Sequence, residues 1–162
     1  MSPADWPPER HEHFLRRAIE VARAARAGGN HPFGAILVDQ HGKVLLEAGN
    51  ASRSSDRTAH AERVLMSQAS SLYDAATLAN CVLYTSAEPC AMCAGAAYWA
   101  GVGGVVYGVS EAYLKALIGP HPENLTMALE CRRVFGAGQR PVWVIGPLLE
   151  AESRAVHEGF WR

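Results

Sequence analysis

The chain has 162 residues, of which 49% are hydrophobic and 19% are charged, and its formal net charge is −1. These values exclude a disordered chain and predict one domain, residues 1–162, that is large enough to bury a proper core. No apolar run approaches the roughly 20 residues that a membrane-spanning helix needs. Residues 1–10 lack a signal-peptide pattern, and the four cysteines do not suggest a disulfide framework. We therefore expect a cytoplasmic protein with no membrane partner.

Helical and strand patterns alternate along the chain without a repeat or a low-complexity linker. In chain order, the first half predicts a helix over 12–27, a hairpin with strands over 33–39 and 44–48, a helix over 61–69 and a buried strand over 81–85. The second half predicts a helix over 90–99, a strand over 104–107, a short helix over 111–117, an irregular segment over 118–125, a strand over 141–145 and a helix over 149–157. Such an order predicts an α/β fold of three layers, α/β/α, around a mixed sheet.

Two short motifs carry most of the chemical information: His60-Ala61-Glu62 and Pro89-Cys90-Ala91-Met92-Cys93. One imidazole and two thiolates make three ligands of a tetrahedral Zn²⁺, and a fourth position left open is the mark of a catalytic zinc. The pattern H-x-E…P-C-x-x-C is a signature of zinc deaminases, in which the glutamate moves protons and is not a ligand. We therefore predict one Zn²⁺ per chain on His60, Cys90 and Cys93, with Glu62 as general acid and base.

The spacing of these motifs suits the beginnings of two helices. Cys90 and Cys93 are three residues apart and so face one side of a first helical turn, where the helix N-terminus favours thiolates. Thr58 is the expected N-cap of the other helix. The backbone N–H groups of Ala61 and Cys90 are then candidates to stabilise a tetrahedral centre on the substrate.

A structural zinc site is the alternative, and it would need a fourth ligand. Cys81 begins an apolar run and is expected to be a buried strand residue, and Cys131 has no partner at ligand spacing. The open site is therefore favoured. A zinc-dependent scaffold without catalysis remains a hypothesis of another class.

The chain resembles the cytidine-deaminase-like superfamily. The matching segments are Pro32-Phe33-Gly34-Ala35, Gly49-Asn50, residues 56–62, residues 83–93 and Val105-Val106-Tyr107-Gly108. The resemblance implies a five-stranded sheet between helices, hydrolytic removal of an amino group, and a homodimer or larger assembly. Two departures are visible: Arg57 stands where proline usually precedes Thr-Ala-His, and the loop after Asn50 is one residue shorter.

The substrate is argued from the residues around the motifs. Tyr84-Thr85-Ser86 and Ala97-Tyr98-Trp99-Ala100 resemble bacterial guanine deaminases, whereas residues 89–95 resemble tRNA adenosine deaminases equally well. A polyanionic RNA substrate calls for a basic face, and a net charge of −1 argues against one. We expect guanine, converted to xanthine and ammonia, or a related base, guanosine, a cytosine analogue or an s-triazine. Adenosine in tRNA is the alternative.

Individual substrate contacts follow from the same resemblance. Asn50 offers a donor and an acceptor to a base edge, although it also suits a turn after Gly49. Phe33 is expected to stack on the base. Trp99 is either an aromatic wall of the pocket or a packing residue of the core or a dimer interface.

The C-terminal third is less typical of the superfamily. Glu123 lies where guanine-type members place an acidic group, with a solvated loop acid as the plainer interpretation and Glu111 as the second candidate. Phe160 and Trp161 are predicted to form a lid over an active site of the same or a neighbouring chain.

Overall fold

A single five-stranded sheet organises the computed structural model, which describes all 162 residues. The strands lie in the order β2-β1-β3-β4-β5. Their bounds are β1 Gly34–Val38, β2 Val44–Gly49, β3 Val82–Ala87, β4 Gly104–Val109 and β5 Trp143–Ile145. Strand β1 is antiparallel to both β2 and β3, whereas β3, β4 and β5 run parallel. The mixed five-stranded sheet expected from the sequence is confirmed.

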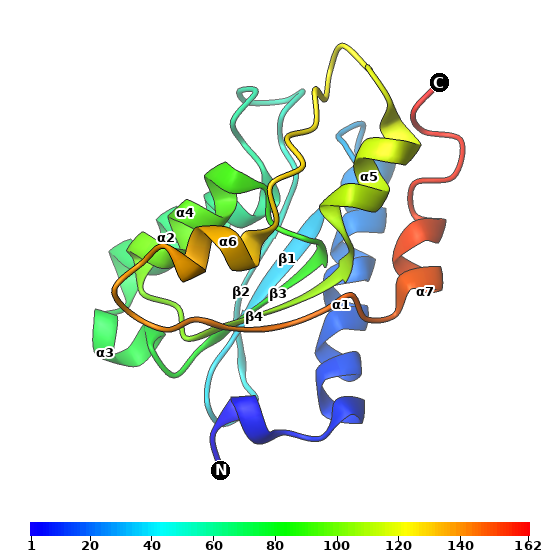
Figure 1. Cartoon of the computed structure of the whole chain (residues 1–162). Helices are drawn as coiled ribbons and strands as arrows, with labels where there is room; N and C mark the ends of the chain where they lie inside the picture. Colours follow the sequence, from blue (N-terminus) through cyan, green and yellow to red (C-terminus); the bar gives the residue numbers. More distant parts are fainter.

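Helices cover both faces of this sheet, as Figure 1 shows. On one face lie α1 (Pro8–Ala27) and α7 (Glu150–Ala155). On the other lie α2 (Ala61–Leu72), α4 (Ala91–Ala100) and α6 (Cys131–Gly136). Because side chains alternate along a strand, Ile36 joins the core under α1 while Leu37 joins the core under α2 and α4. The three-layer architecture is therefore also confirmed.

Several short elements were not predicted. The 3₁₀ helix η1 (Pro3–Asp5) and the helices α3 (Ala75–Leu78) and α6 have three to six residues each, too few to show a hydrophobic period. Helix α1 begins at Pro8, four residues before the expected start, because its first turn is polar and proline suits that position. The expected cap of α2 is wrong: His60 is the N-cap, and Thr58 bonds Asp56 instead.

One edge of the sheet gathers the chemically interesting segments. The first turns of α2 and α4 lie there, beside the end of β3, and α5 (Glu111–Ile118) follows β4 at the same edge. The segment 119–130 then crosses this edge before α6 begins (Figure 1).

Gly34 allows β1 to pack closely on α1, since a Cβ there would overlap the backbone of Ala22. No helix combines the length and apolarity that crossing a membrane requires.

Candidate active site

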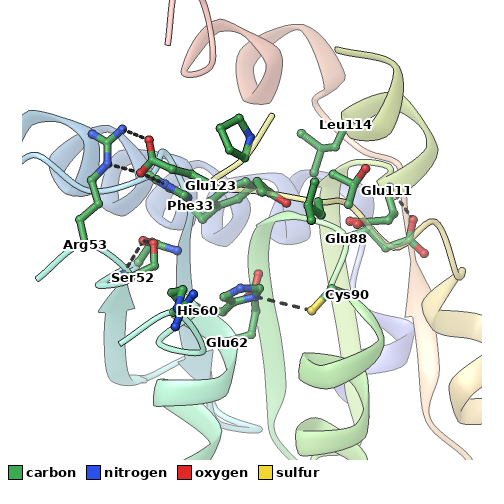
Figure 2. A pocket seen from close by; sticks show the side chains of 17 residues that line it. Phe33, Ser52, Arg53, His60, Glu62, Glu88, Cys90, Glu111, Leu114 and Glu123 are labelled. Atoms are coloured by element: carbon green, nitrogen blue, oxygen red, sulfur yellow. Dashed lines mark hydrogen bonds and ion pairs between the residues drawn. The ribbon is translucent and has the colours of Figure 1, made fainter. Parts of the chain in front are cut away.

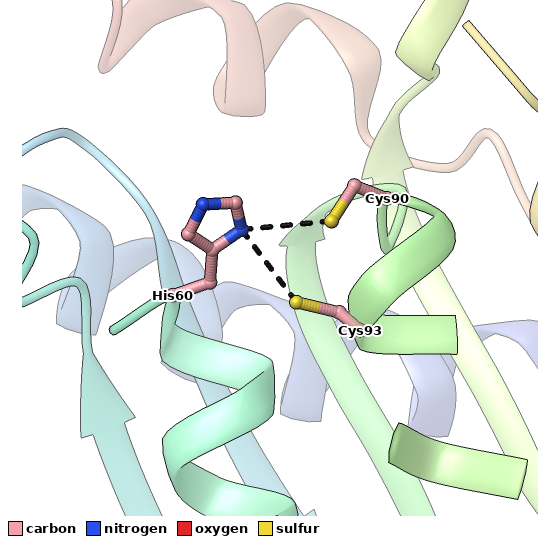
Figure 3. Close-up of side chains that lie close together, drawn as sticks. All are labelled: His60, Cys90 and Cys93. Atoms are coloured by element: carbon pink, nitrogen blue, oxygen red, sulfur yellow. Dashed lines mark hydrogen bonds between the residues drawn. The ribbon is translucent and has the colours of Figure 1, made fainter. Parts of the chain in front are cut away.

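The three predicted metal ligands converge at the helix ends (Figure 3). His60 is the N-cap of α2, Cys90 is the N-cap of α4, and Cys93 lies in the first turn of α4. The Nδ1 atom of His60 is 3.5 Å from Sγ of Cys90 and 3.6 Å from Sγ of Cys93. Zinc–nitrogen and zinc–sulfur bonds at a tetrahedral angle give an N···S separation of roughly 3.6 Å. The donor set therefore fits Zn²⁺.

No fourth side chain joins this cluster, which consists of these three residues. Cys81 and Cys131 are both buried outside this cluster, and the Sγ–H of Cys81 donates a hydrogen bond to the carbonyl oxygen of Thr77. The arrangement is thus that of a three-ligand site with one position available to water or substrate.

The ligands also influence one another's protonation. A hydrogen bond with Cys93, together with the contact to His60, lowers the pKa of the Cys90 thiol to about 4. The same hydrogen bond and burial raise the pKa of Cys93, and the contact with Cys90 raises that of His60. The surroundings therefore favour the thiolate at Cys90, which is the form of cysteine that binds a metal.

Glu62 lies in the first turn of α2, lines the cavity, and is only 4% exposed. Burial is the main reason why its pKa is raised. Oγ1 of Thr85 lies 2.6 Å from Oε1 of Glu62 and 2.8 Å from the carbonyl oxygen of Ala87. The hydroxyl can donate to an ionised Glu62, or accept from a protonated one while it donates to Ala87. Thr85 therefore holds the carboxyl in place in both protonation states.

The cavity around these residues has a volume of about 340 Å³ and 17 lining residues. Figure 2 shows His60, Glu62 and Cys90 together at one end of the group. Ser52 and Arg53 lie to one side, and Glu111 and Leu114 to the other (Figure 2). The space thus lies between the β2–α2 loop and the first turns of α5, with the metal ligands at its base.

Asn50 lines this cavity, and hydrogen bonds orient its side-chain amide. Its Oδ1 accepts hydrogen bonds from the backbone N–H of Ser52 at 2.9 Å and from the Ser52 hydroxyl at 2.8 Å. Because a backbone N–H can only donate, the atom facing it must be the amide oxygen. Both of these bonds engage the amide oxygen, so the side-chain groups of Asn50 that are left without a partner in the chain are its N–H donors.

Both candidate acids line the cavity, but their surroundings differ. Glu111 is 6% exposed, and burial is the main cause that raises the pKa of its carboxyl to about 8. Glu123 sits at the rim, where Arg53 binds both of its oxygens and His31 lies 3.3 Å away. The bond from Arg53 is the main reason why the pKa of Glu123 is lowered to about 2.

The other predicted contacts divide into two groups. Phe33 lines the cavity, whereas Trp99 and Ala61 do not. The expectation that Trp99 forms a wall of its own chain's pocket is wrong: its side chain is 86% exposed. It lies six residues after Cys93, so α4 turns it away from the face that carries the ligands. Ala61 is buried in the core, with its backbone N–H in the first turn of α2.

The C-terminal tail packs behind the rim rather than over the cavity. Neither Phe160 nor Trp161 lines the cavity. The ring of Trp161 lies 4.9 Å from that of His31, centroid to centroid, and its Nε1 donates to Nδ1 of His157 at 3.0 Å. The guanidinium of Arg53 lies 5.1 Å from the ring of Phe160. The tail thus supports the residues that form the rim in the same chain.

Comparison with known protein families decides the classification. A family model described as "Cytidine and deoxycytidylate deaminase zinc-binding region" matches residues 8–109, which include all three ligands and Glu62. The chain belongs to this deaminase family. The resemblance seen in the sequence motifs is therefore confirmed, and so is hydrolytic C–N deamination as the chemistry of the family.

Curated relatives of this zinc-binding deaminase act on different amines. A "Probable cytosine deaminase" of Schizosaccharomyces pombe is 40% identical over 149 residues, or 91% of this chain and 90% of that protein. The guanine deaminase of Bacillus subtilis is 44% identical over 99 residues, or 60% of this chain and 63% of that enzyme. A tRNA-specific adenosine deaminase of Haemophilus influenzae is 39% identical over 101 residues, or 62% of this chain and 58% of that protein.

Solved structures of similar proteins share the fold. The guanine deaminase from Nitrosomonas europaea superposes with a TM-score of 0.73 at 28% identity, over 88% of this chain and 80% of that one. A mutant protein in complex with 8-azaguanine superposes with a TM-score of 0.76 at 28% identity, over 90% of this chain and 82% of that one.

Proposed function

We propose that the chain is a hydrolytic deaminase of a free nucleobase that carries both an amino and an oxo group, with guanine as the leading substrate. The observation that carries this proposal is the placement of Glu62 beside three ligands of a metal, at the base of a cavity of about 340 Å³. A bound Zn²⁺ would lower the pKa of its water ligand to roughly 7 and so supply hydroxide at neutral pH.

Glu62 would carry the protons of the reaction. It accepts a proton from the attacking water, delivers it to the ring nitrogen, and then helps to protonate the departing ammonia. The balance is water plus an aminated carbon giving a carbonyl and ammonia. Thr85 keeps the Glu62 carboxyl pointed at the reacting atoms throughout these transfers.

The remaining cavity residues suit a lactam, in which a carbonyl adjoins a ring N–H. Asn50 presents amide donors, which match a carbonyl oxygen. Glu111 offers a buried carboxyl on the other side, which can accept from a ring N–H. Phe33 supplies an aromatic surface for a flat base. Guanine and cytosine both contain this lactam, whereas adenine does not.

Cytosine is the second candidate. The relative from S. pombe favours it, since that match covers nearly the whole chain. Adenosine in tRNA is disfavoured, because a polyanionic RNA substrate calls for a basic face and the net charge of the chain is −1.

The experiment is a panel of ammonia-release assays on the zinc-loaded protein. Its members are guanine, guanosine, cytosine, cytidine, adenine, ammeline and a tRNA anticodon hairpin. We expect the highest kcat/KM with guanine, activity with cytosine as the next best free base, and no binding of the hairpin. Turnover of the hairpin alone, with a steep loss of affinity in salt, would contradict the proposal.

For the tail we propose a supporting role. Phe160 and Trp161 hold His31 and Arg53 in the positions that shape the rim. Truncation after Glu158 should therefore raise KM while the protein stays folded and keeps its metal. Unchanged kinetics of a folded truncated protein would count against this role.

We also propose that the chain forms a homodimer through the outer face of α4. Trp99 and Met92 lie seven residues apart on this helix, and both side chains are exposed. An apolar pair of this kind on one helix face suits burial against a second copy. Sedimentation should give a dimer that Trp99→Glu converts to a monomer; a wild-type monomer at all concentrations would refute it.

A further inference from the structure

Glu88 has a position that neither the motifs nor the proposed chemistry explains. It follows β3 directly and precedes Pro89 and the ligand Cys90. Its side chain is buried, with 4% of its surface exposed, yet it lines the cavity. A buried carboxylate is costly unless hydrogen bonds compensate for its lost hydration, so its partners indicate its role.

Both oxygens of Glu88 are bonded to main-chain N–H groups that are distant in sequence. Oε1 accepts from the N–H of Glu111 at 2.9 Å, and Oε2 accepts from the N–H of Cys131 at 2.8 Å. Glu111 and Cys131 are the first residues of α5 and α6. First-turn N–H groups have no partner inside their own helix, and the helix dipole favours a negative charge beside them.

These two bonds fix both ends of one stretch of chain, residues 111–131. Seven of the 17 residues that line the cavity lie within it: Glu111, Leu114 and the five from Pro122 to Thr126. The stretch forms the side of the cavity that faces the β2–α2 loop, and Figure 2 shows Glu88 beside Glu111 near the metal ligand Cys90. A single carboxylate thus joins the metal-binding loop to the substrate-facing wall.

From this arrangement we propose that Glu88 is a positioning residue that sets the distance between the metal ligands and the wall carrying Glu111. This inference rests on the proposed function. It assigns to Glu88 no contact with the substrate and no proton transfer. Loss of either bond loosens the wall, so substrate affinity falls while the metal and Glu62 remain in place.

The test is Glu88→Gln in the zinc-loaded protein, because a glutamine side chain has one acceptor oxygen in place of two. We expect KM for the deaminated base to rise about tenfold, with kcat at saturation changed by less than roughly threefold and zinc content unchanged. Amide hydrogen exchange at Glu111 and Cys131 should accelerate, which reports on the wall independently of activity.

The matched control is Asp39→Ala. Asp39 also accepts two main-chain N–H groups, from His41 and Lys43, but in the turn between β1 and β2. The Asp39→Ala protein should lose stability without a change in KM.

A second variant, Cys131→Pro, removes the N–H donor to Oε2 of Glu88 and leaves the Glu88 side chain unchanged. Proline suits the first position of a helix, and the extended backbone of Glu130 (φ −61°, ψ 135°) is compatible with a following proline.

Wild-type KM in a folded Glu88→Gln or Cys131→Pro protein would overturn the proposal, as would loss of zinc together with activity. If Glu88→Gln does not fold, Cys131→Pro decides the question. If the wild type releases ammonia from no free base, the proposed function fails. Amide exchange at Glu111 and Cys131 then still shows whether Glu88 fixes the wall.

Discussion

Arg53 binds both carboxylate oxygens of Glu123, with Nε 2.8 Å from Oε1 and Nη2 2.9 Å from Oε2. This fork joins the β2–α2 loop to the segment that follows α5, across the mouth of the cavity. Glu123 is therefore paired with Arg53 at the rim, whereas Glu111 is buried in the wall of the cavity.

The fork predicts that its two residues act as a unit. Arg53→Lys keeps the charge but loses the paired geometry, and Glu123→Gln loses the charge. We expect each substitution to raise KM roughly three- to tenfold. The KM of the double variant should be no higher than that of the more impaired single variant. Steady-state kinetics on the four proteins measures this. A much larger effect of Glu123→Gln alone would mean that Glu123 reads the substrate directly.

We predict that the hydrogen bond between Thr85 and Glu62 contributes to kcat. Thr85→Val removes the hydroxyl that holds Glu62 in both protonation states. We expect kcat to fall about 10- to 100-fold, with a small change in KM, because proton transfer by a positioned group contributes roughly 100-fold or more. Thr85→Ser keeps the hydroxyl and is the matched control. Equal activity of the valine and serine variants would show that the contact has no role in turnover.

The proposed zinc site leads to a prediction for removal of the metal. Chelation should abolish ammonia release and lower the thermal midpoint, and added Zn²⁺ should restore both, because a metal that binds only the folded state stabilises it. Cys93→Ser should lose zinc in metal analysis. Cys81→Ser, a change at a buried cysteine outside the cluster, should retain it. Full activity of the chelated protein would contradict the assignment.

We predict that His157 makes the free energy of unfolding fall in acid. Burial is the main cause that lowers its pKa from 6.5 to about 4, and its Nδ1 accepts from Trp161. Between these values the unfolded chain binds more protons at this residue than the folded one. This contribution to the free energy of unfolding is therefore complete above pH 6.5 and lost as the pH falls to about 4.

The variant that isolates this effect is His157→Asn, which does not titrate but keeps an acceptor for Trp161. Its thermal midpoint should depend less on pH between 6.5 and 4 than that of the wild type. His13→Gln, a change at an exposed histidine, is the control. Parallel pH profiles for the wild type and His157→Asn would refute the prediction.

The sequence predicts the parts of this protein that depend on local spacing. His60, Cys90 and Cys93 follow from motif spacing at helix starts, and the sheet follows from short apolar runs that alternate with helical segments along the chain. Trp99 was misplaced because a motif position does not say which side of a helix faces the cavity.

The contacts that the sequence did not reveal join distant segments. Thr85 and Glu62 are 23 residues apart, and Glu88 and Cys131 are 43 apart. Only the strand order brings these pairs together. No local sequence pattern indicates that Thr85 or Glu88 makes such a contact. Arg53 with Glu123, 70 residues apart, is a third case.

The most direct measurement of the central claim combines zinc content with ammonia release in Glu62→Gln. We predict about one zinc per chain, a fold like that of the wild type, and ammonia release from guanine and cytosine at least 100-fold slower. Release at the wild-type rate by the zinc-loaded variant would contradict the assignment of Glu62 as the group that moves protons at this site.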